Sequence, residues 1–342
     1  MAVLMLCNTP VYDITNDVIL SKIFCPFPET SLNRNAYKRW RANRVYLRSN
    51  RIAERIIQQA GGIGTREAKR RMSLSDGYWV RYSYDEKTSF ESITPYLNSF
   101  SEARVVRGSV HSSSVPELVV GGSQPKLWAR GSDGITYLRK SELPEQIKAE
   151  LLAVKLIRKC GVGVMNAFIQ TNEGKVYADN YSASQDLESI GVINLVNMTS
   201  VNRSLIHFDQ MGINVNGYSP VSVTAGYKQA GVTEDVIAEA ITQVVVDAVV
   251  GNTDRKTNNS NWAIFMDNRT GKHEPSKMYD FNWAVYAEAP EQITEVSGNI
   301  KKAGIEIIKT ASEQAARIHD ACKELGLTPW QENAQLLYEL LL

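Results

Sequence analysis

Residues 244–282 read VVVDAVVGNTDRKTNNSNWAIFMDNRTGKHEPSKMYDFN, and this stretch sets the fold that we expect for the chain. It opens as an apolar helix that reaches back to about residue 233, and Gly251 ends that helix. A polar loop follows. Two short apolar runs then flank a turn signal at residues 267–271, which is typical of a β-hairpin. The sequence therefore predicts a helix, a polar loop and a hairpin in direct succession.

This hairpin predicts that polar side chains far apart in the sequence meet. If its centre lies between Arg269 and Thr270, residues equally far from the centre face each other, and Asn259 and Asp280 are such a pair. Asp254 lies on the same loop, five residues before Asn259. An amide oxygen beside a carboxylate suits Mg²⁺, which keeps waters and substrate phosphates as further ligands. A second carboxylate can orient the proton of an attacking hydroxyl, so the arrangement is typical of phosphoryl transfer.

A glycine-rich loop at residues 121–126 precedes a second predicted hairpin. We centre its turn at residues 132–133, which places Lys140 across from residues 124 and 125. The lysine then lies beside the glycine-rich loop. Glu150, ten residues further on in the next predicted helix, is placed to hold that lysine.

Hydrophobic periodicity predicts the remaining elements. Further strands are expected at residues 78–82, 164–170 and 175–179, and helices at 38–59, 144–160, 185–198, 233–250, 301–325 and 328–341. The pattern changes from a small antiparallel sheet with one helix to a series of helices. We therefore expect a boundary near residues 180–184.

Composition and charge exclude several classes of protein. Hydrophobic residues make up 43% of the 342 residues and charged residues 22%, so most of the chain is expected to fold. The net charge of +1 predicts neither a nucleic-acid binder nor a membrane-surface protein. No apolar stretch approaches the roughly 18 residues of a membrane span, and the N-terminus lacks the pattern of a signal peptide. These features favour a cytoplasmic protein without a membrane partner.

The N-terminal segment is more basic than the rest. Residues 1–72 hold 13 basic and 5 acidic side chains, a net charge of +8, which leaves −7 for the remainder. Five arginines in this segment share one predicted helix face, namely Arg41, Arg44, Arg48, Arg51 and Arg55. Such a stripe could follow a phosphate backbone, but a solvated face or pairing with acidic neighbours is the more usual case. Direct nucleic-acid binding is therefore not favoured.

Several motifs in order resemble those of HipA-like serine/threonine kinases. They are Ser73–Val80, Gly121–Lys126, Gly251–Asp254 with Asn259, and Tyr279–Phe281. The resemblance covers about residues 70 to 290. It implies an α+β, bilobal protein-kinase-like fold, related to protein and phosphoinositide 3-kinases, with ATP and Mg²⁺ between the lobes. On this basis residues 1–72 are a basic, helical N-terminal segment, residues 73–181 the small antiparallel-sheet N-lobe and residues 182–342 the mainly helical C-lobe.

The resemblance also implies roles for individual residues. Asp254 is similar to the catalytic Asp, and Asn259 and Asp280 are similar to the metal ligands, with Asn261 as a competitor of Asn259. Lys256 stands where the family often has His and keeps a positive charge near the γ-phosphate. Lys140 resembles the phosphate-binding lysine, and residues 179–181 resemble the hinge that faces adenine. The nucleotide-binding set is Gly121, Gly122, Ser123, Gln124, Lys126, Lys140, Glu150, Asp179 and Tyr181.

The function predicted from these residues is that of an ATP- and Mg²⁺-dependent protein serine/threonine kinase. Its substrate is a protein hydroxyl, and the family implies autophosphorylation, for which Ser112, Ser113, Ser114 and Ser123 are candidates. The family also implies a toxin–antitoxin context with an antitoxin or regulatory partner. Two alternatives stay open. The chain could be a catalytically silent kinase-like module that binds nucleic acid or a protein through its basic helix, or a kinase for a small molecule or lipid.

Overall fold

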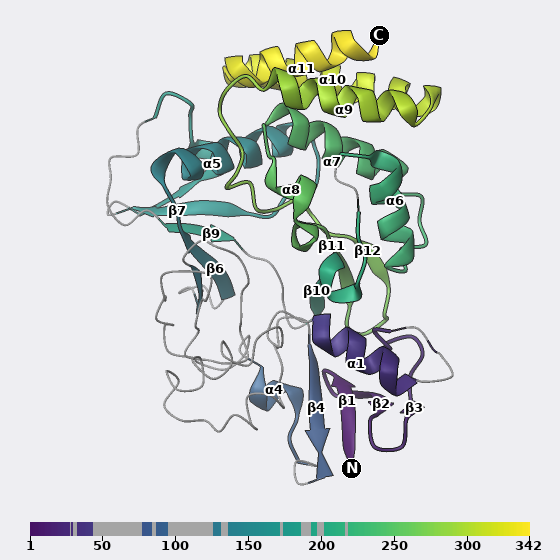
Figure 1. Cartoon of the computed structure of the whole chain (residues 1–342). Coiled ribbons are helices and arrows are strands. Elements are labelled where there is room, and N and C mark those ends of the chain that lie inside the picture. Colours follow the sequence, from purple (N-terminus) through teal and green to yellow (C-terminus); the bar gives the residue numbers. More distant parts are fainter. Residues whose placement is uncertain are drawn as a thin grey trace. The chain divides into compact units, whose positions relative to one another are not determined.

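The computed structural model of the chain describes most of its residues (Figure 1). These are residues 1–27, 29, 33–43, 77–83, 87–94, 126–130, 136–171, 174–185, 193–196, 202–215 and 218–342. The chain divides into two units. Unit 1 holds Met1–Lys140, Asn197–Gly212 and Ile264–Glu274, and unit 2 holds Ser141–Val196, Ile213–Ala263 and Pro275–Leu342. The domain boundaries predicted at residues 72 and 181 remain a proposal.

Unit 1 begins with a four-stranded antiparallel sheet in the order β3-β2-β1-β4. Its strands are β1 Ala2–Leu6, β2 Thr9–Asp13, β3 Val18–Ile19 and β4 Tyr78–Tyr82. The apolar run of β1 lies between β2 and β4, where almost all of it is buried. Helix α1, Asn33–Asn43, adds Tyr37 and Trp40 to an aromatic cluster with side chains of the sheet. The rings of this aromatic cluster belong to Tyr12, Phe27, Tyr37, Trp40 and Tyr78.

The rest of unit 1 is made of hairpins and short elements. These are α4 Phe90–Ile93, β5 Lys126–Arg130, β6 Thr136–Ser141, β10 Arg203–His207, β11 Ala263–Asp267 and β12 His273–Pro275. Strands β5 and β6 form an antiparallel hairpin. Strand β11 lies between β10 and β12 in a three-stranded sheet. Both hairpins predicted from the sequence are therefore present.

Unit 2 combines three strands with a group of helices. The strands are β7 Ala167–Thr171, β8 Gly174–Tyr177 and β9 Ile193–Val196, and β7 pairs with both others in antiparallel fashion. The helices are α5 Pro144–Lys159, α6 Pro220–Gln229, α7 Ile237–Val249, α8 Asp254–Thr257, α9 Pro290–Lys302, α10 Ile305–Leu325 and α11 Thr328–Leu341.

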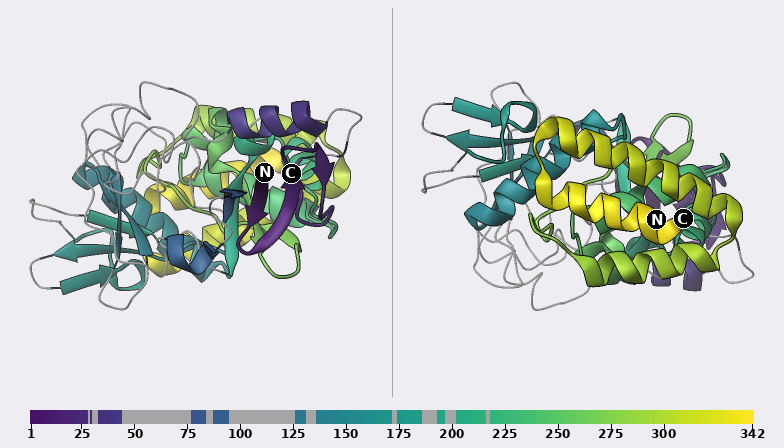
Figure 2. Two further views of the ribbon diagram at one scale, coloured as in Figure 1. Left: turned by 90° about the horizontal axis from the view of Figure 1, so that it is seen from below. Right: turned by 90° about the horizontal axis from the view of Figure 1, so that it is seen from above.

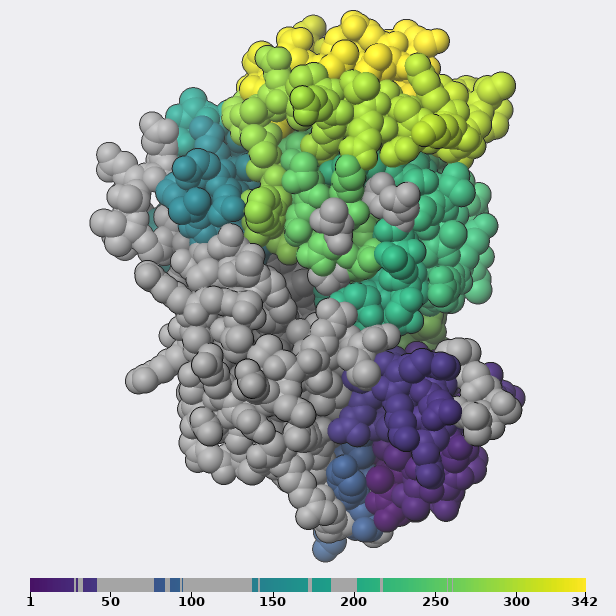
Figure 3. All heavy atoms as spheres, viewed as in Figure 1, coloured from purple at the N-terminus to yellow at the C-terminus, as the bar shows by residue number. Residues whose placement is uncertain are grey.

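Helix α7 is the centre of the helical part of unit 2. It is buried from Ala240 to Val249 and contacts α6, α9, α10 and α11. The last three helices lie side by side as one layer, seen from above in Figure 2 and as a continuous surface in Figure 3. Because α7 is enclosed on so many sides, the residues at its C-terminal end start from a rigid base. No helix among the described residues is long and apolar enough to cross a bilayer.

The predicted fold class, a mixed α and β chain with small antiparallel sheets and a mainly helical part, is confirmed. Several element predictions are wrong. The segment predicted to be a helix at 185–198 contains strand β9, as β-branched Ile193 and Val196 favour. The helix predicted over 301–325 starts only at Ile305, because Gly304, at φ 113°, separates α10 from α9. The N-terminal segment, predicted to be helical, contains strands β1 to β3 before α1. Residues 44–59 of its predicted helix lie outside the described residues.

Candidate active site

The polar loop after α7 begins with a turn that only glycine adopts easily. Gly251 has φ of 69°, and a Cβ atom at this position would lie 3.4 Å from the carbonyl oxygen of Val285. Its neighbour Asn252 is fully buried, and the Nδ2 of Asn252 donates to the Oδ1 of Asp247 at 3.0 Å. The chain therefore leaves α7 on a fixed path, which leads to Asp254 at the start of α8.

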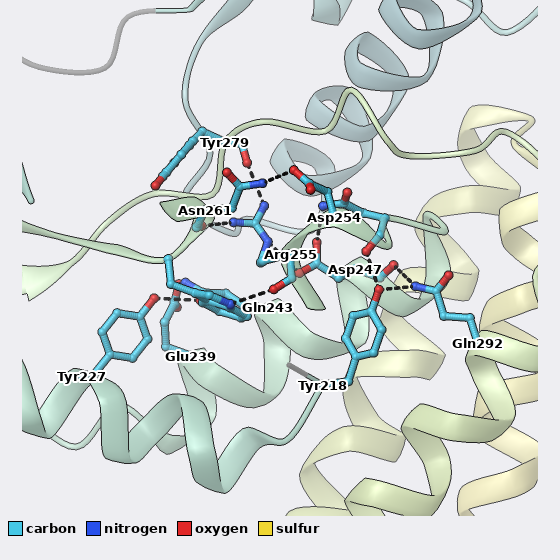
Figure 4. Close-up of polar contacts among 12 residues, drawn as sticks. Tyr218, Tyr227, Glu239, Gln243, Asp247, Asp254, Arg255, Asn261, Tyr279 and Gln292 are labelled. Carbon is cyan, nitrogen blue, oxygen red and sulfur yellow. Dashed lines mark hydrogen bonds and ion pairs between the residues drawn. The ribbon is translucent and has the colours of Figure 1, made fainter. Parts of the chain in front are cut away.

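Asp254 accepts hydrogen bonds from two asparagines of its own loop. The Nδ2 of Asn261 lies 2.6 Å from Asp254 Oδ2, and the Nδ2 of Asn258 lies 3.4 Å from the same atom. Figure 4 shows the amide of Asn261 directed at the carboxylate of Asp254. Of the two asparagines considered as metal ligands, Asn261 is thus the one that contacts the candidate catalytic carboxylate.

Asn259 is engaged elsewhere. Its Oδ1 accepts from the backbone N–H of Val215 at 3.1 Å, and its Nδ2 donates to Asn214 Oδ1 at 2.6 Å. One of the two lone pairs of the Asn259 amide oxygen is therefore occupied by a backbone hydrogen bond. No hydrogen bond reaches the Oδ1 of Asn261 from the part of the chain that the structure describes.

The register of the β11–β12 hairpin is as predicted, but its ladder stops before the site. Asp267 N donates to Lys272 O and Ser276 N donates to Ala263 O, so the centre lies between residues 269 and 270. Beyond the ladder, Asn259–Asn261 form a 3-10 turn, and Met278 pairs with Val164 instead. The expectation that the hairpin itself pairs Asn259 with Asp280 is therefore wrong.

Asp280 follows this hairpin in an unusual backbone conformation. Its φ is 60°, a left-handed value that is uncommon outside glycine and that often marks functional positions. Arg255 links Asp280 electrostatically to the loop. Burial alone would lower the pKa of Arg255, but the pKa is raised above its ordinary value by nearby acidic groups, chiefly the carboxylate of Asp247 and, more weakly, that of Asp280. Asp280 thus lies within electrostatic reach of the residue next to Asp254.

Arg255 itself is buried at the centre of this region, with 3% of its side chain exposed. Its Nε lies 2.7 Å from Asp247 Oδ2, its Nη1 donates to Asn261 O, and its Nη2 donates to Tyr279 O at 2.7 Å. Its guanidinium also lies 5.3 Å to 5.9 Å from the ring centroids of Trp262, Tyr279 and Phe281. Figure 4 shows Asp247, Asn261 and Tyr279 around the side chain of Arg255.

Asp247 completes this buried centre from helix α7. Its side chain is fully buried, and burial raises its pKa to about 6 against the attraction of Arg255 and the bond from Asn252. Neither Asp247 nor Arg255 was predicted as a site residue. A signal did exist, because a lone Asp in the run VVVDAVV has to find a partner when the helix is buried, and Arg255 is the next cation along the chain.

A second set of bonds links the start of the loop to helix α9. The hydroxyl of Tyr218 donates to Asn252 O and accepts from Gln292 Nε2 at 2.7 Å. Gln292 Nε2 also lies 3.1 Å from the backbone oxygen of Asp247. These bonds join the C-terminal end of α7, the loop and α9, as Figure 4 shows.

Lys256, predicted as a catalytic residue, forms an ion pair at the surface. Its Nζ lies 2.6 Å from Glu295 Oε2, and 39% of the lysine side chain is exposed. The same Nζ lies 5.9 Å from the ring centroid of Tyr218. The role predicted for Lys256 is neither supported nor contradicted by this pairing.

The predicted phosphate-binding residues are placed only in part. Residues 121–125 of the glycine-rich loop lie outside the described residues, as do the serines at 112–114. Lys140 pairs in register with Lys126, so the predicted partners, residues 124 and 125, are one or two positions off. Lys140 is 2% exposed and Glu150 is 1% exposed. A lysine at a strand end and a glutamate on a helix are usually exposed to solvent, so both residues are more buried than is usual at such positions. The pairing of Lys140 with Glu150 remains a prediction.

The predicted hinge residues lie after strand β8 in unit 2. Asp179 is 61% exposed and pairs with Arg158 at 2.7 Å, whereas Tyr181 is fully buried. Tyr181 also lines a cavity of about 740 Å³, together with the first turns of α5 and residues 282–286. That volume lies within the range of about 300 to 1,000 Å³ that is common for small-molecule pockets. The first residue of the lining segment 282–286 follows Asp280 by two positions in the sequence.

Among the comparisons with known proteins, the search of solved structures gives matches. A scan against protein-family models finds no match, and neither does a search of curated protein sequences. Among solved structures, a chain of the HipA–HipB–operator DNA complex of a Shewanella oneidensis MR-1 toxin–antitoxin system matches with a TM-score of 0.55 and 12% identity. The match covers 100% of this chain and 96% of that chain. A Helicobacter pylori proinflammatory kinase, CtkA, matches with a TM-score of 0.39 and 14% identity, over 63% of this chain and 88% of that chain.

The Shewanella match defines the class of fold. The chain shares its fold with the matched chain of that complex. The resemblance to HipA-like kinases is therefore confirmed for the fold.

Proposed function

We propose that this chain is an ATP- and Mg²⁺-dependent protein serine/threonine kinase of the HipA-like type. The observation that carries the proposal is the 2.6 Å contact between Asn261 and Asp254, together with the hydrogen bond from Arg255 to the carbonyl of Tyr279, the residue before Asp280. An amide and two carboxylates on adjoining segments are the groups that phosphoryl transfer requires. The shared fold supports the same reading.

The donor set fits a magnesium ion. Asn261 binds Asp254 through its nitrogen, which leaves its Oδ1 directed elsewhere, and Asp280 supplies a carboxylate. Oxygen donors of this kind suit Mg²⁺. Asn261 and Asp280 would hold the ion, whose charge would supply electrostatic stabilisation to the phosphates. We therefore propose Asn261 and Asp280 as its ligands, which replaces Asn259 in the earlier prediction.

The chain's own residues would do the remaining work by positioning. Asp254 would orient the acceptor hydroxyl and accept its proton, and Lys140 would orient the phosphates, with Glu150 as its partner. The glycine-rich loop would cover the phosphates. The cavity lined by Tyr181 supports a nucleotide base near the predicted hinge. Each of these assignments predicts a loss of transfer on substitution.

A transfer assay with γ-labelled ATP and Mg²⁺ tests the proposal. Wild type should label a generic protein acceptor or itself, and Asp254→Ala should reduce labelling to background with an unchanged melting temperature. Asp320→Ala is the matched control, because this aspartate is 77% exposed and pairs only with the adjacent His319 among the described contacts. Equal labelling by wild type and Asp254→Ala, or labelling that persists in EDTA, would reject the proposal.

We further propose that a protein of the antitoxin type is a partner. The support is that the matched Shewanella structure holds HipA with HipB and operator DNA. Co-expression with a small gene that adjoins the chain's own gene should give a complex that co-purifies and has reduced transfer activity. The rival nucleic-acid function depends on Arg44 to Arg55, which lie outside the described residues, so no observation favours it. No observation favours a lipid acceptor either.

A further inference from the structure

We infer that the buried pair Asp247–Arg255 is a positioning device that holds the three candidate site residues in one arrangement. The inference rests on the proposed function for its catalytic consequence. Its structural part rests on the contacts alone. Neither residue would touch the substrate, so both are positioning residues.

The three nitrogens of Arg255 serve three different segments. Nε faces Asp247 on α7, Nη1 donates to the carbonyl of Asn261, and Nη2 donates to the carbonyl of Tyr279. The first of these segments is the rigid helix. The other two carbonyls belong to Asn261 itself and to the residue before Asp280. Arg255 therefore fixes the backbone at two of the site residues and adjoins the third, Asp254.

The choice of arginine is explained by this geometry. A guanidinium has five N–H donors in a planar fork, whereas an ammonium is a single point of charge. A lysine at this position could keep the charge opposite Asp247, but it could not reach the carbonyls of Asn261 and Tyr279 at the same time. The rings of Trp262 and Phe281 also lie within cation–π distance of the guanidinium, at 5.4 Å and 5.3 Å.

A pair that serves stability alone would not need these particular acceptors. Buried ion pairs can often be replaced by apolar residues of similar volume without loss of stability. What an apolar pair cannot supply is the two hydrogen bonds to Asn261 O and Tyr279 O. The double variant Asp247→Leu/Arg255→Met therefore separates the two roles.

The experiment compares this double variant, Arg255→Lys and Asp247→Asn with wild type. We expect kcat to fall about 100-fold, as for a small misplacement of reacting groups, with a much smaller change in the KM for ATP. We also expect backbone amides of residues 254–262 and 277–281 to exchange hydrogen faster, with α10 and α11 unchanged. Thr242→Val is the control, because it removes a partly buried hydrogen bond within the same helix, from the hydroxyl of Thr242 to the carbonyl of Ala238 at 2.9 Å.

The outcomes separate the inference from the proposed function. If the double variant keeps both the wild-type kcat and the wild-type exchange pattern, the pair is only structural and the inference fails. If wild type transfers no phosphate, the proposed function fails, and the exchange pattern still decides the inference. If the double variant does not fold, Asp247→Asn decides, because asparagine can still accept the bond from Asn252. Unchanged exchange in folded Asp247→Asn and Arg255→Lys would overturn the inference.

Discussion

Two buried regions of the molecule differ in chemistry: the aromatic cluster of unit 1 is apolar, whereas the region around Arg255 in unit 2, here called the Arg255 centre, is charged and polar. The aromatic cluster joins five rings whose centroids lie 5.2 Å to 6.2 Å apart. The Arg255 centre joins a buried carboxylate, a guanidinium and two backbone carbonyls. The burial of apolar surface that stabilises the rings is non-directional, whereas each hydrogen bond fixes a distance and a direction.

This difference indicates what each region does. An apolar cluster tolerates changes of shape when its volume is kept. A buried polar centre tolerates little, because an unpaired charge or carbonyl is costly in a dry interior. The buried polar centre of unit 2 should therefore tolerate fewer substitutions than the aromatic cluster. We attribute this to its role in orienting Asp254, Asn261 and Asp280. The following predictions test that contrast.

The largest loss of stability is expected from Asp247→Ala. Removal of one partner of a buried ion pair costs about 3 to 5 kcal/mol, because the other charge stays buried and unpaired. Urea unfolding at pH 7 measures the loss. Glu239→Ala is the control, since Glu239 is a carboxylate on the same helix that bonds only to Gln243 at 2.9 Å among the described contacts. Similar losses of unfolding free energy in the two variants would show that an unpaired Arg255 is not the cause of the loss.

The next largest effect is expected from Asn261→Ala, compared with Asn259→Ala. Loss of a group that holds a ligand or its neighbour commonly costs up to about 100-fold in activity or metal affinity. We expect such a loss for Asn261→Ala, with a higher Mg²⁺ requirement for transfer. Asn259→Ala should stay close to wild type in that requirement, because its amide is bonded to Asn214 and Val215. The reverse ranking would return the metal role to Asn259.

The two asparagines also show how much of the candidate site can be predicted from the sequence. Apolar alternation and the turn at residues 267–271 predict the hairpin and its centre correctly. The error comes from extending the ladder to Asn259 and Asp280. Whether a ladder continues depends on tertiary partners, and here Val164 takes Met278. A local pattern cannot contain that information.

The buried centre was harder to predict for a related reason. Periodicity identifies α7 as a buried helix, but it does not say which cation neutralises Asp247. The loop turns at Gly251 and brings Arg255 back onto the helix, a geometry that depends on packing against Val285. The sequence therefore identifies the residues of the family-like motifs, but not Asp247 and Arg255, which hold them in place.

A smaller effect is expected in the aromatic cluster from Phe27→Leu. The ring of Phe27 meets Tyr12 edge-on at 5.2 Å, and 6% of the residue is exposed. Leucine keeps most of the apolar volume, so the loss should be about 1 kcal/mol, mainly from the lost ring contacts. Urea unfolding followed by tryptophan fluorescence measures it. A loss as large as that of Asp247→Ala would remove the contrast between the two regions.

The smallest effect is expected at Asp267, a carboxylate that is partly open to solvent. Its pKa lies well below its ordinary value of 3.8, because the side chain of Arg269 and the backbone N–H groups of Arg269 and Thr270 donate to it. A depressed pKa in the folded state means that the stabilisation is fully present at neutral pH and is lost as pH falls below 3.8 towards the folded value. Exposed pairs contribute little, about 0 to 1 kcal/mol. Wild type should therefore exceed Asp267→Asn slightly in urea stability at pH 7, and the gap should shrink towards pH 3. A constant gap across that range would mean that charge plays no part at this turn, whereas a gap as large as that of Asp247→Ala would mean that burial does not decide how much an ion pair contributes.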